Sequence, residues 1–114
     1  MSRDDYHVIV YKILEYLYAC MKHGIPVEVE NIAYNSKAID IAEEYWKEII
    51  INLLEEGYIK GVILIPIVGS KQKGIKFDDL KITPKGIDYL VDNSLMKKAK
   101  GYAKTVLETL GIFL

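Results

Sequence analysis

The segment Leu53-Leu54-Glu55-Glu56-Gly57-Tyr58-Ile59 decides how the chain is interpreted, because a helical pattern changes to a strand pattern within it. Before the glycine, apolar residues recur at spacings of three and four and predict the inner face of a helix ending at Glu56: Ala42, Trp46, Ile49, Ile50 and Leu53. Gly57 is typical of the residue that follows a helix. Residues 58–68 are rich in β-branched side chains and predict a strand.

Downstream of this strand, the pattern predicts a hairpin and a further short helix. Residues 75–82 are expected to form the second strand, and the polar, glycine-bounded residues 69–74 the tip between the strands. Thr83 followed by Pro84 predicts an N-cap and a first helical residue, since proline lacks the N–H that is unpaired at that position. This helix is expected to run through Ile87, Leu90 and Val91 and to end near Asn93.

Upstream, the sequence predicts two further helices. Residues 4–23 have a wide apolar arc and a narrow polar stripe through Lys12, Glu15 and Lys22, so we expect two neighbours to cover this helix. Residues 29–37 are expected to form a short second helix that buries Ile32 and Ala33. Asp40 and Glu43 have the spacing of a capping box and predict the start of the next helix.

Three helices followed by a hairpin is the element order of a winged helix-turn-helix. The segments 53–59 and 82–90 look like the corresponding parts of bacterial winged-helix regulators. The family resemblance rests on the chain length, the near-terminal first helix, the Glu-Gly-Tyr-Ile junction at 56–59 and the pattern Thr83-x-x-Gly86-x-x-Tyr89-Leu90. Over roughly residues 9–92 the chain resembles the YjcQ-like family of small winged-helix proteins from bacteria and prophages. The resemblance implies an α+β, mostly helical winged helix of three helices and a two-stranded wing with additional C-terminal helices, and a phage or prophage origin. The family has no established activity, so the resemblance implies no function.

The length of 114 residues predicts one domain, with a winged-helix core over 1–93 and an amphipathic helix over 94–114. The charged N-terminus predicts no signal peptide. The longest apolar stretch, residues 62–68, is too short to span a bilayer, so no membrane partner is expected. A single cysteine, Cys20, fits a reducing compartment, and a cytoplasmic location is therefore expected.

No pattern in the sequence indicates a catalytic, cofactor-binding or metal-binding site, so the protein is not expected to be an enzyme. Cys20 and His23 are three residues apart, but zinc needs three or four ligands and no second pair exists. His7 lacks a local nucleophile or carboxylate partner. Residues 69–74 lack the Lys-Ser/Thr ending of a phosphate loop, and Asp78 and Asp79 lack further oxygen ligands for a cation.

The net charge of −1 conceals a segregation of acids and lysines. Residues 39–59 contain Lys47 alone against six acids: Asp40, Glu43, Glu44, Glu48, Glu55 and Glu56. Lysines predominate in residues 60–104.

The first hypothesis is a non-catalytic DNA-binding protein and transcriptional regulator, in which duplex DNA is contacted by Lys47 and by the wing residues Lys71, Lys73 and Lys76. The acids on the helix that would enter the DNA groove are expected to repel the phosphates. Binding should therefore be weak and strongly salt-dependent.

The alternative hypothesis is a winged-helix protein-interaction module that does not bind DNA. The chain has nine tyrosines, and Tyr16, Tyr34 and Tyr45 are expected at the surface, with Ile41 on the same side of its helix as Tyr45. The apolar C-terminal segment needs cover, which predicts a homodimer. The expected interface residues are Tyr45, Tyr102, Val106, Leu110 and Phe113.

Overall fold

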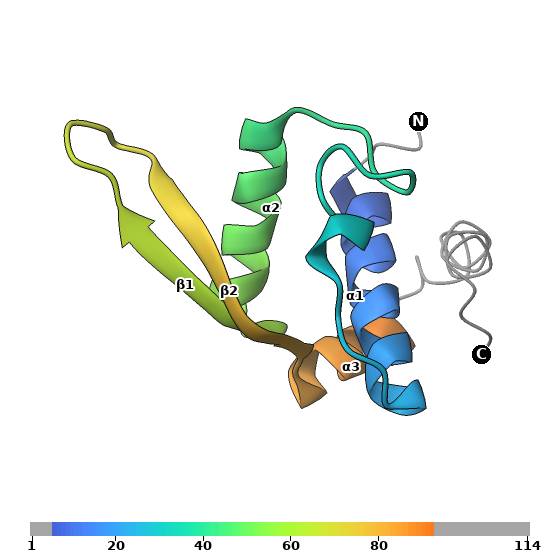
Figure 1. The fold of residues 1–114 in the computed structure, drawn as a ribbon. Helices are drawn as coiled ribbons and strands as arrows, with labels where there is room; N and C mark the ends of the chain where they lie inside the picture. The colour runs from blue at the N-terminus through green and yellow to red at the C-terminus, as the bar shows by residue number, and fades with distance from the viewer. Residues whose placement is uncertain (1–5, 93–114) are drawn as a thin grey trace.

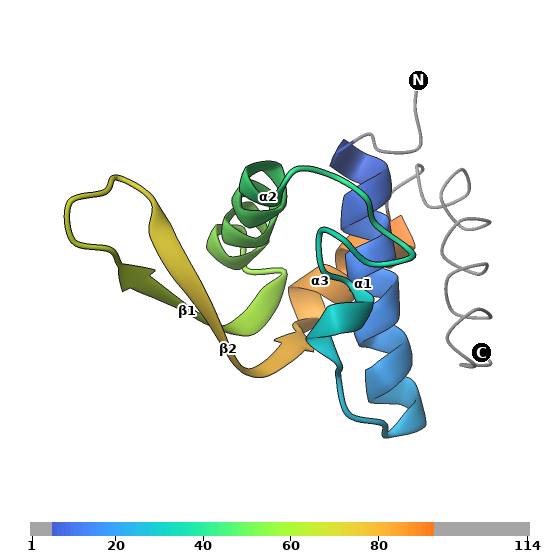
Figure 2. The same ribbon diagram turned by 45° about the horizontal axis from the view of Figure 1, so that its top comes forward.

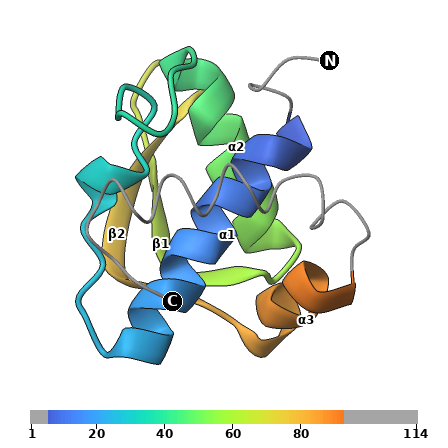
Figure 3. The same ribbon diagram turned by 90° about the vertical axis from the view of Figure 1, so that its right-hand side faces the viewer.

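Helix α1, Tyr6–His23, is the centre of the fold in the computed structural model, which describes residues 6–92 (Figure 1). Its buried residues lie on nearly all sides: Ile9, Val10, Tyr11, Ile13, Leu14, Tyr16, Leu17, Ala19 and Cys20. Lys12 and Glu15 are half-buried and Lys22 is exposed, which confirms the narrow polar stripe. The helix contacts α2, β2 and α3, and Figure 3 shows it crossing in front of α2 and the two strands. The predicted first helix is therefore confirmed over its described residues.

The segment after α1 corrects the prediction of a second helix over residues 29–37. The structure has only a 3-10 helix, Val29–Asn31, followed by turns. The hydroxyl of Tyr16 accepts hydrogen bonds from the Glu28 backbone N–H and the Asn31 amide, both at 3.0 Å. Contacts from α1 thus hold this segment in a turn. The prediction that Tyr16 lies at the surface is wrong, because its side chain is buried, with 2% exposed. Ile32 is buried as predicted, while Ala33 is only half-buried.

Helix α2, Glu43–Glu55, confirms the predicted third helix but not its predicted start. Asp40 forms an isolated bridge with Asn35, and Ala42 occupies the N-cap position without a side-chain hydrogen bond. The predicted capping box is therefore wrong, because Asp40 pairs with Asn35 and lies ahead of the N-cap residue Ala42. Trp46, Ile49, Ile50 and Leu53 are buried as predicted. Ala42 is exposed instead, and Ile41 precedes the helix and packs against the core.

Strands β1, Ile59–Pro66, and β2, Lys73–Ile82, form an antiparallel hairpin that projects beside α2 (Figures 1 and 2). Both predicted strands are confirmed with shifted ends, since β2 begins at Lys73 rather than residue 75. The ladder is irregular between Lys60 and Val62. There Gly61 has φ 87° and Asp79 has φ 59°, and a Cβ on Gly61 would overlap the carbonyl oxygens of Asp78 and Asp79. Only glycine fits this bulge.

Helix α3, Pro84–Asp92, begins as the sequence predicts. The Thr83 hydroxyl accepts a hydrogen bond from Gly86 N–H at 3.1 Å and donates one to the Gly57 carbonyl. This residue therefore ties the end of the hairpin to the turn after α2. The ring of Tyr89 lies 4.9 Å from that of Tyr58 and 5.6 Å from that of Tyr11, so α3 closes the core against α1.

The described residues form an α+β fold of three α-helices and a two-stranded antiparallel sheet. Its core is one buried cluster that joins α1, α2, α3 and the base of the hairpin. The predicted C-terminal helix over 94–114 lies outside the described residues.

Candidate functional site

The solvent-facing side of α2 is acidic. Glu43, Glu44, Glu48 and Glu55 are all exposed. The only lysine of this helix, Lys47, lies 3.8 Å from Glu43 in an ion pair, and its side chain is 22% exposed. Glutamates in the first turn are favourable next to the positive end of the helix dipole. Lys47, predicted to contact DNA, is therefore partly neutralised by its own helix.

The free end of the hairpin is basic. Lys71, Lys73 and Lys76 are exposed, and within residues 6–92 none of them has an ion-pair partner within 4.0 Å. From Lys60 to Phe77 the chain contains no acid. The acids of α2 and the lysines of the hairpin thus belong to two separate elements, and the hairpin projects to one side of α2 and diverges from it toward its free end (Figures 1 and 2).

A groove of about 610 Å³ runs between α2 and the free end of the hairpin. One wall carries Glu44, Glu48 and Glu55, and the other carries Lys71 and Lys73. We call it the charge-split groove; its remaining lining residues are Tyr45, Lys47, Ile51, Leu64 and Gln72. Tyr45 is 37% exposed, so this predicted interface residue lies in an accessible groove.

The outer face of the hairpin is apolar. Ile63, Ile65 and Ile67 are between 43% and 45% exposed, and Val68 at the tip is 102% exposed. In the ladder Ile63 pairs with Lys76 and Ile65 with Gly74, whereas Leu64 pairs with Ile75. Since paired residues point to the same side of a sheet, Lys76 lies on the outer face, away from the charge-split groove.

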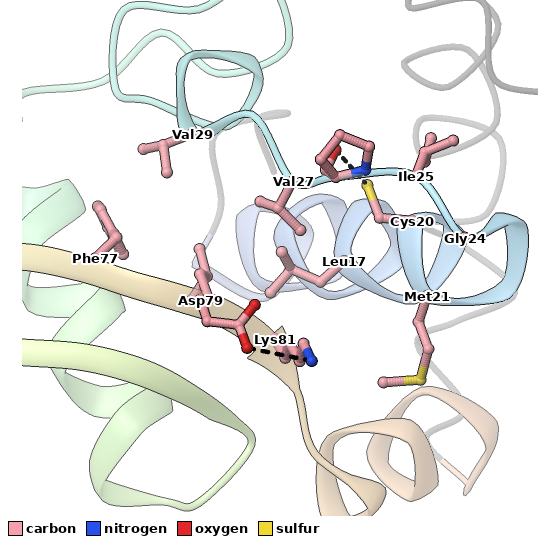
Figure 4. A pocket seen from close by; sticks show the side chains of 12 residues that line it. Leu17, Cys20, Met21, Gly24, Ile25, Val27, Val29, Phe77, Asp79 and Lys81 are labelled. Carbon is pink, nitrogen blue, oxygen red and sulfur yellow. Dashed lines mark hydrogen bonds and ion pairs between the residues drawn. The ribbon is translucent and has the colours of Figure 1, made fainter.

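A second pocket, of about 720 Å³, lies between the end of α1, residues 24–29 and β2 (Figure 4). Its lining is mostly apolar: Leu17, Cys20, Met21, Gly24, Ile25, Pro26, Val27, Val29, Phe77, Asp79, Leu80 and Lys81. Asp79 and Lys81 form a 3.2 Å ion pair at its edge. Burial raises the pKa of the Cys20 thiol, which lies 3.9 Å from the Pro26 carbonyl. A neutral, buried thiol is a poor nucleophile, so Cys20 acts here as a packing residue.

No constellation of catalytic groups stands out among the described residues. In residues 6–92 no group of three or more His, Cys, Asp or Glu side chains is placed to hold a metal ion. His7 Nδ1 lies 3.4 Å from the Tyr89 hydroxyl at the surface. None of the described helices combines the length and apolar character that crossing a membrane requires.

The structure separates the predicted site residues. Lys71, Lys73 and Tyr45 line the charge-split groove together, Lys47 lies within it as the partner of Glu43, and Lys76 faces the other way. Glu44, Glu48, Ile51 and Leu64 also line the groove and were not predicted as site residues. The sequence showed that acids and lysines are segregated, but it did not show that the acids of α2 and the lysines of the hairpin line one groove. The predicted interface residues Tyr102, Val106, Leu110 and Phe113 lie outside the described residues.

These features define a small α+β protein whose described residues form a charge-split groove and a mostly apolar pocket. The family model described as YjcQ protein matches residues 11–109. The chain belongs to the YjcQ family, which confirms the resemblance seen in its sequence. No curated protein and no solved structure matches the chain.

Proposed function

We propose that this chain is a non-catalytic winged-helix module that binds another protein through α2 and the adjoining hairpin. The order of α1, the 3-10 helix, α2 and the hairpin supports the winged-helix assignment, with α2 in the place of the recognition helix and the hairpin in the place of the wing. The 3-10 helix Val29–Asn31 takes the place of the short second helix. The buried free cysteine fits a cytoplasmic location.

The acidic outward side of α2 is the observation that carries this proposal. A recognition helix enters the major groove between two rows of phosphates, where lysine and arginine supply most of the affinity. Glu44, Glu48 and Glu55 would face those phosphates, and Lys47 is engaged with Glu43. The same face, with Tyr45 beside the acids, suits a protein surface that carries basic and apolar side chains.

DNA binding as a transcriptional regulator of phage or prophage type is the second candidate. It is favoured by three exposed lysines toward the free end of the hairpin that have no ion-pair partner within residues 6–92. Lys71, Lys73 and Lys76 would contact phosphates, which gives weak binding without sequence preference. In this candidate α2 stays outside the major groove.

Site-specific photo-crosslinking in cells tests both candidates. A photoreactive amino acid is placed at Tyr45 or Ile51 in the charge-split groove, at Ser70 in the hairpin tip, and at the exposed Asp88 of α3 as control. Discrete protein adducts at positions 45 and 51, absent at 88, are expected. Nucleic-acid adducts at position 70, without protein adducts at positions 45 and 51, would overturn the proposal in favour of the second candidate.

Binding of duplex DNA, followed by fluorescence anisotropy, provides the complementary test. We expect weak binding at physiological salt that weakens equally for all sequences when Lys71, Lys73 and Lys76 are replaced by alanine. Nanomolar, sequence-selective binding would overturn the interaction proposal, and it would also show that DNA is contacted by more than the hairpin lysines of the second candidate. The homodimer expected through residues 94–114 is part of this proposal, and light scattering at micromolar concentration measures it.

A further inference from the structure

We infer that the charge-split groove binds a polypeptide segment with basic side chains along one edge, acidic side chains along the other and apolar side chains between them. This inference rests on the proposed function and specifies the chemistry of the partner. It follows from the charges of the two walls and from the apolar side chains that line the groove with them.

The acidic wall of the groove is expected to attract cationic side chains of a bound segment. Glu44 and Glu48 are one helical turn apart, and like charges at this spacing destabilise a helix. Both are exposed, and neither has an ion-pair partner within 4.0 Å in the described residues. A lysine or arginine of a bound segment would relieve this repulsion on the α2 side.

The basic wall of the groove is expected to attract anionic side chains of a bound segment. Lys71 and Lys73 flank Gln72 at the end of the hairpin, and both lack an acid partner in the described part of the chain. Lys73 is paired with Pro66 in the ladder, so it lies on the same side of the sheet as Leu64 and points toward the groove. Aspartate or glutamate on the opposite edge of a bound segment would pair with this wall.

The walls carry opposite charges but form no direct ion pair with each other, because no carboxylate of α2 lies within 4.0 Å of a hairpin lysine in the described residues. Tyr45, Ile51 and Leu64 also line the groove and offer it apolar surface. A groove of about 610 Å³ has room for several side chains. A segment in this space would meet the acids of α2 on one side, the lysines of the hairpin on the other, and apolar side chains from both elements.

This arrangement disfavours a polyanion. Nucleic acid or an anionic lipid surface would pair with Lys71 and Lys73 but would be repelled by Glu44, Glu48 and Glu55 in the same groove. A segment of mixed charge satisfies both walls at once, and charge complementarity of this kind sets specificity as well as the rate of association.

Two synthetic peptides of identical composition provide the probe. In the first, lysines and glutamates lie on opposite edges of an apolar stripe; in the second, the same charges are mixed on both edges. Binding to the full chain is measured by nuclear magnetic resonance shifts of the Tyr45, Ile51 and Leu64 amides. We expect the segregated peptide to bind about tenfold more tightly than the mixed one, and its binding to weaken as salt is added.

Charge reversal tests each wall. Glu44→Lys with Glu48→Lys, or Lys71→Glu with Lys73→Glu, should each abolish the preference for the segregated peptide. All four substitutions together should restore it, because a short peptide can turn end to end and exchange its edges. Glu30→Lys with Lys37→Glu, two exposed positions outside the groove, serves as control and should leave binding unchanged. Circular dichroism verifies that each variant is folded.

The outcomes separate this inference from the proposed function. Equal binding of both peptides, no binding of either, or no recovery in the fourfold variant overturns the charge-split assignment. If protein adducts still form at Tyr45 in cells, the interaction function stands and only the partner chemistry is wrong. Adducts absent at Tyr45 and Ile51 overturn the proposed function itself.

Discussion

The hairpin carries isoleucines both at its base and toward its free end, but those at the base are buried and those toward the free end are exposed. At the base, Ile59, Leu80 and Ile82 are buried against the helices. At the free end, Ile63 and Ile65 of the same strand face outward. Since β1 has isoleucine at both places, packing against the helices and not residue type decides which isoleucine contributes to the core. The base is therefore expected to determine stability and the free end to determine binding.

The largest expected effect is at the bulge in the hairpin base. Gly61→Ala should destabilise the domain by about 4 kcal/mol, because the new Cβ would overlap two backbone carbonyls. Gly69→Ala is the matched control: its φ of 78° is also positive, but no atom lies within 4 Å of the added Cβ. That variant should lose only about 1 kcal/mol. Urea denaturation measures both, and equal losses would show that the bulge is not tightly packed.

A smaller effect is expected where the hairpin joins α3. Thr83→Ala should lower the free energy of unfolding by about 1–2 kcal/mol, because the N-cap of α3 and the bond to the Gly57 carbonyl are both lost. Thr83→Ser keeps the hydroxyl and should recover most of the stability. If serine and alanine are equivalent in thermal denaturation, the methyl group rather than the hydroxyl stabilises the junction.

Two tyrosines, Tyr16 beside the turn after α1 and Tyr89 on α3, should make the free energy of unfolding sensitive to alkaline pH. Burial raises the pKa of Tyr16 and Tyr89 above the ordinary value of 10.0. A raised pKa in the folded state means that these groups stabilise the fold fully below pH 10 and lose that contribution as pH rises through their folded pKa values. Tyr16→Phe should cost about 1 kcal/mol at neutral pH. Above pH 10 its melting temperature should decline less steeply than that of the wild type; parallel declines would contradict this role.

The smallest effect is expected at the free end of the hairpin. Ile65→Thr keeps a β-branched side chain on the outer face and should change stability by less than about 0.5 kcal/mol. Ile59→Thr in the same strand should cost about 2–3 kcal/mol, because it places a hydroxyl in the core. Chemical denaturation of the pair tests the comparison directly. Similar losses would mean that the outer face is covered in solution.

The sequence alone determined the elements whose formation is local. Gly57 ends α2 and opens the hairpin, and Thr83-Pro84 starts α3, because backbone freedom and end-capping depend on residues adjacent in the chain. The apolar spacing also predicted the buried faces of α1 and α2. Membership of the YjcQ family was likewise evident from sequence motifs.

Only the tertiary structure decided the segment between α1 and α2 and the charge-split groove. Residues 29–37 have a helical pattern, but the Tyr16 hydroxyl binds the Glu28 N–H and the Trp46 indole binds the Ile32 carbonyl, so distant side chains determine the turn. Likewise, Glu48 and Lys73 are far apart in sequence and share a groove only because the hairpin folds back beside α2. Hydrogen bonds and charges of this kind act through space, and local pattern carries no information about which distant residues will meet.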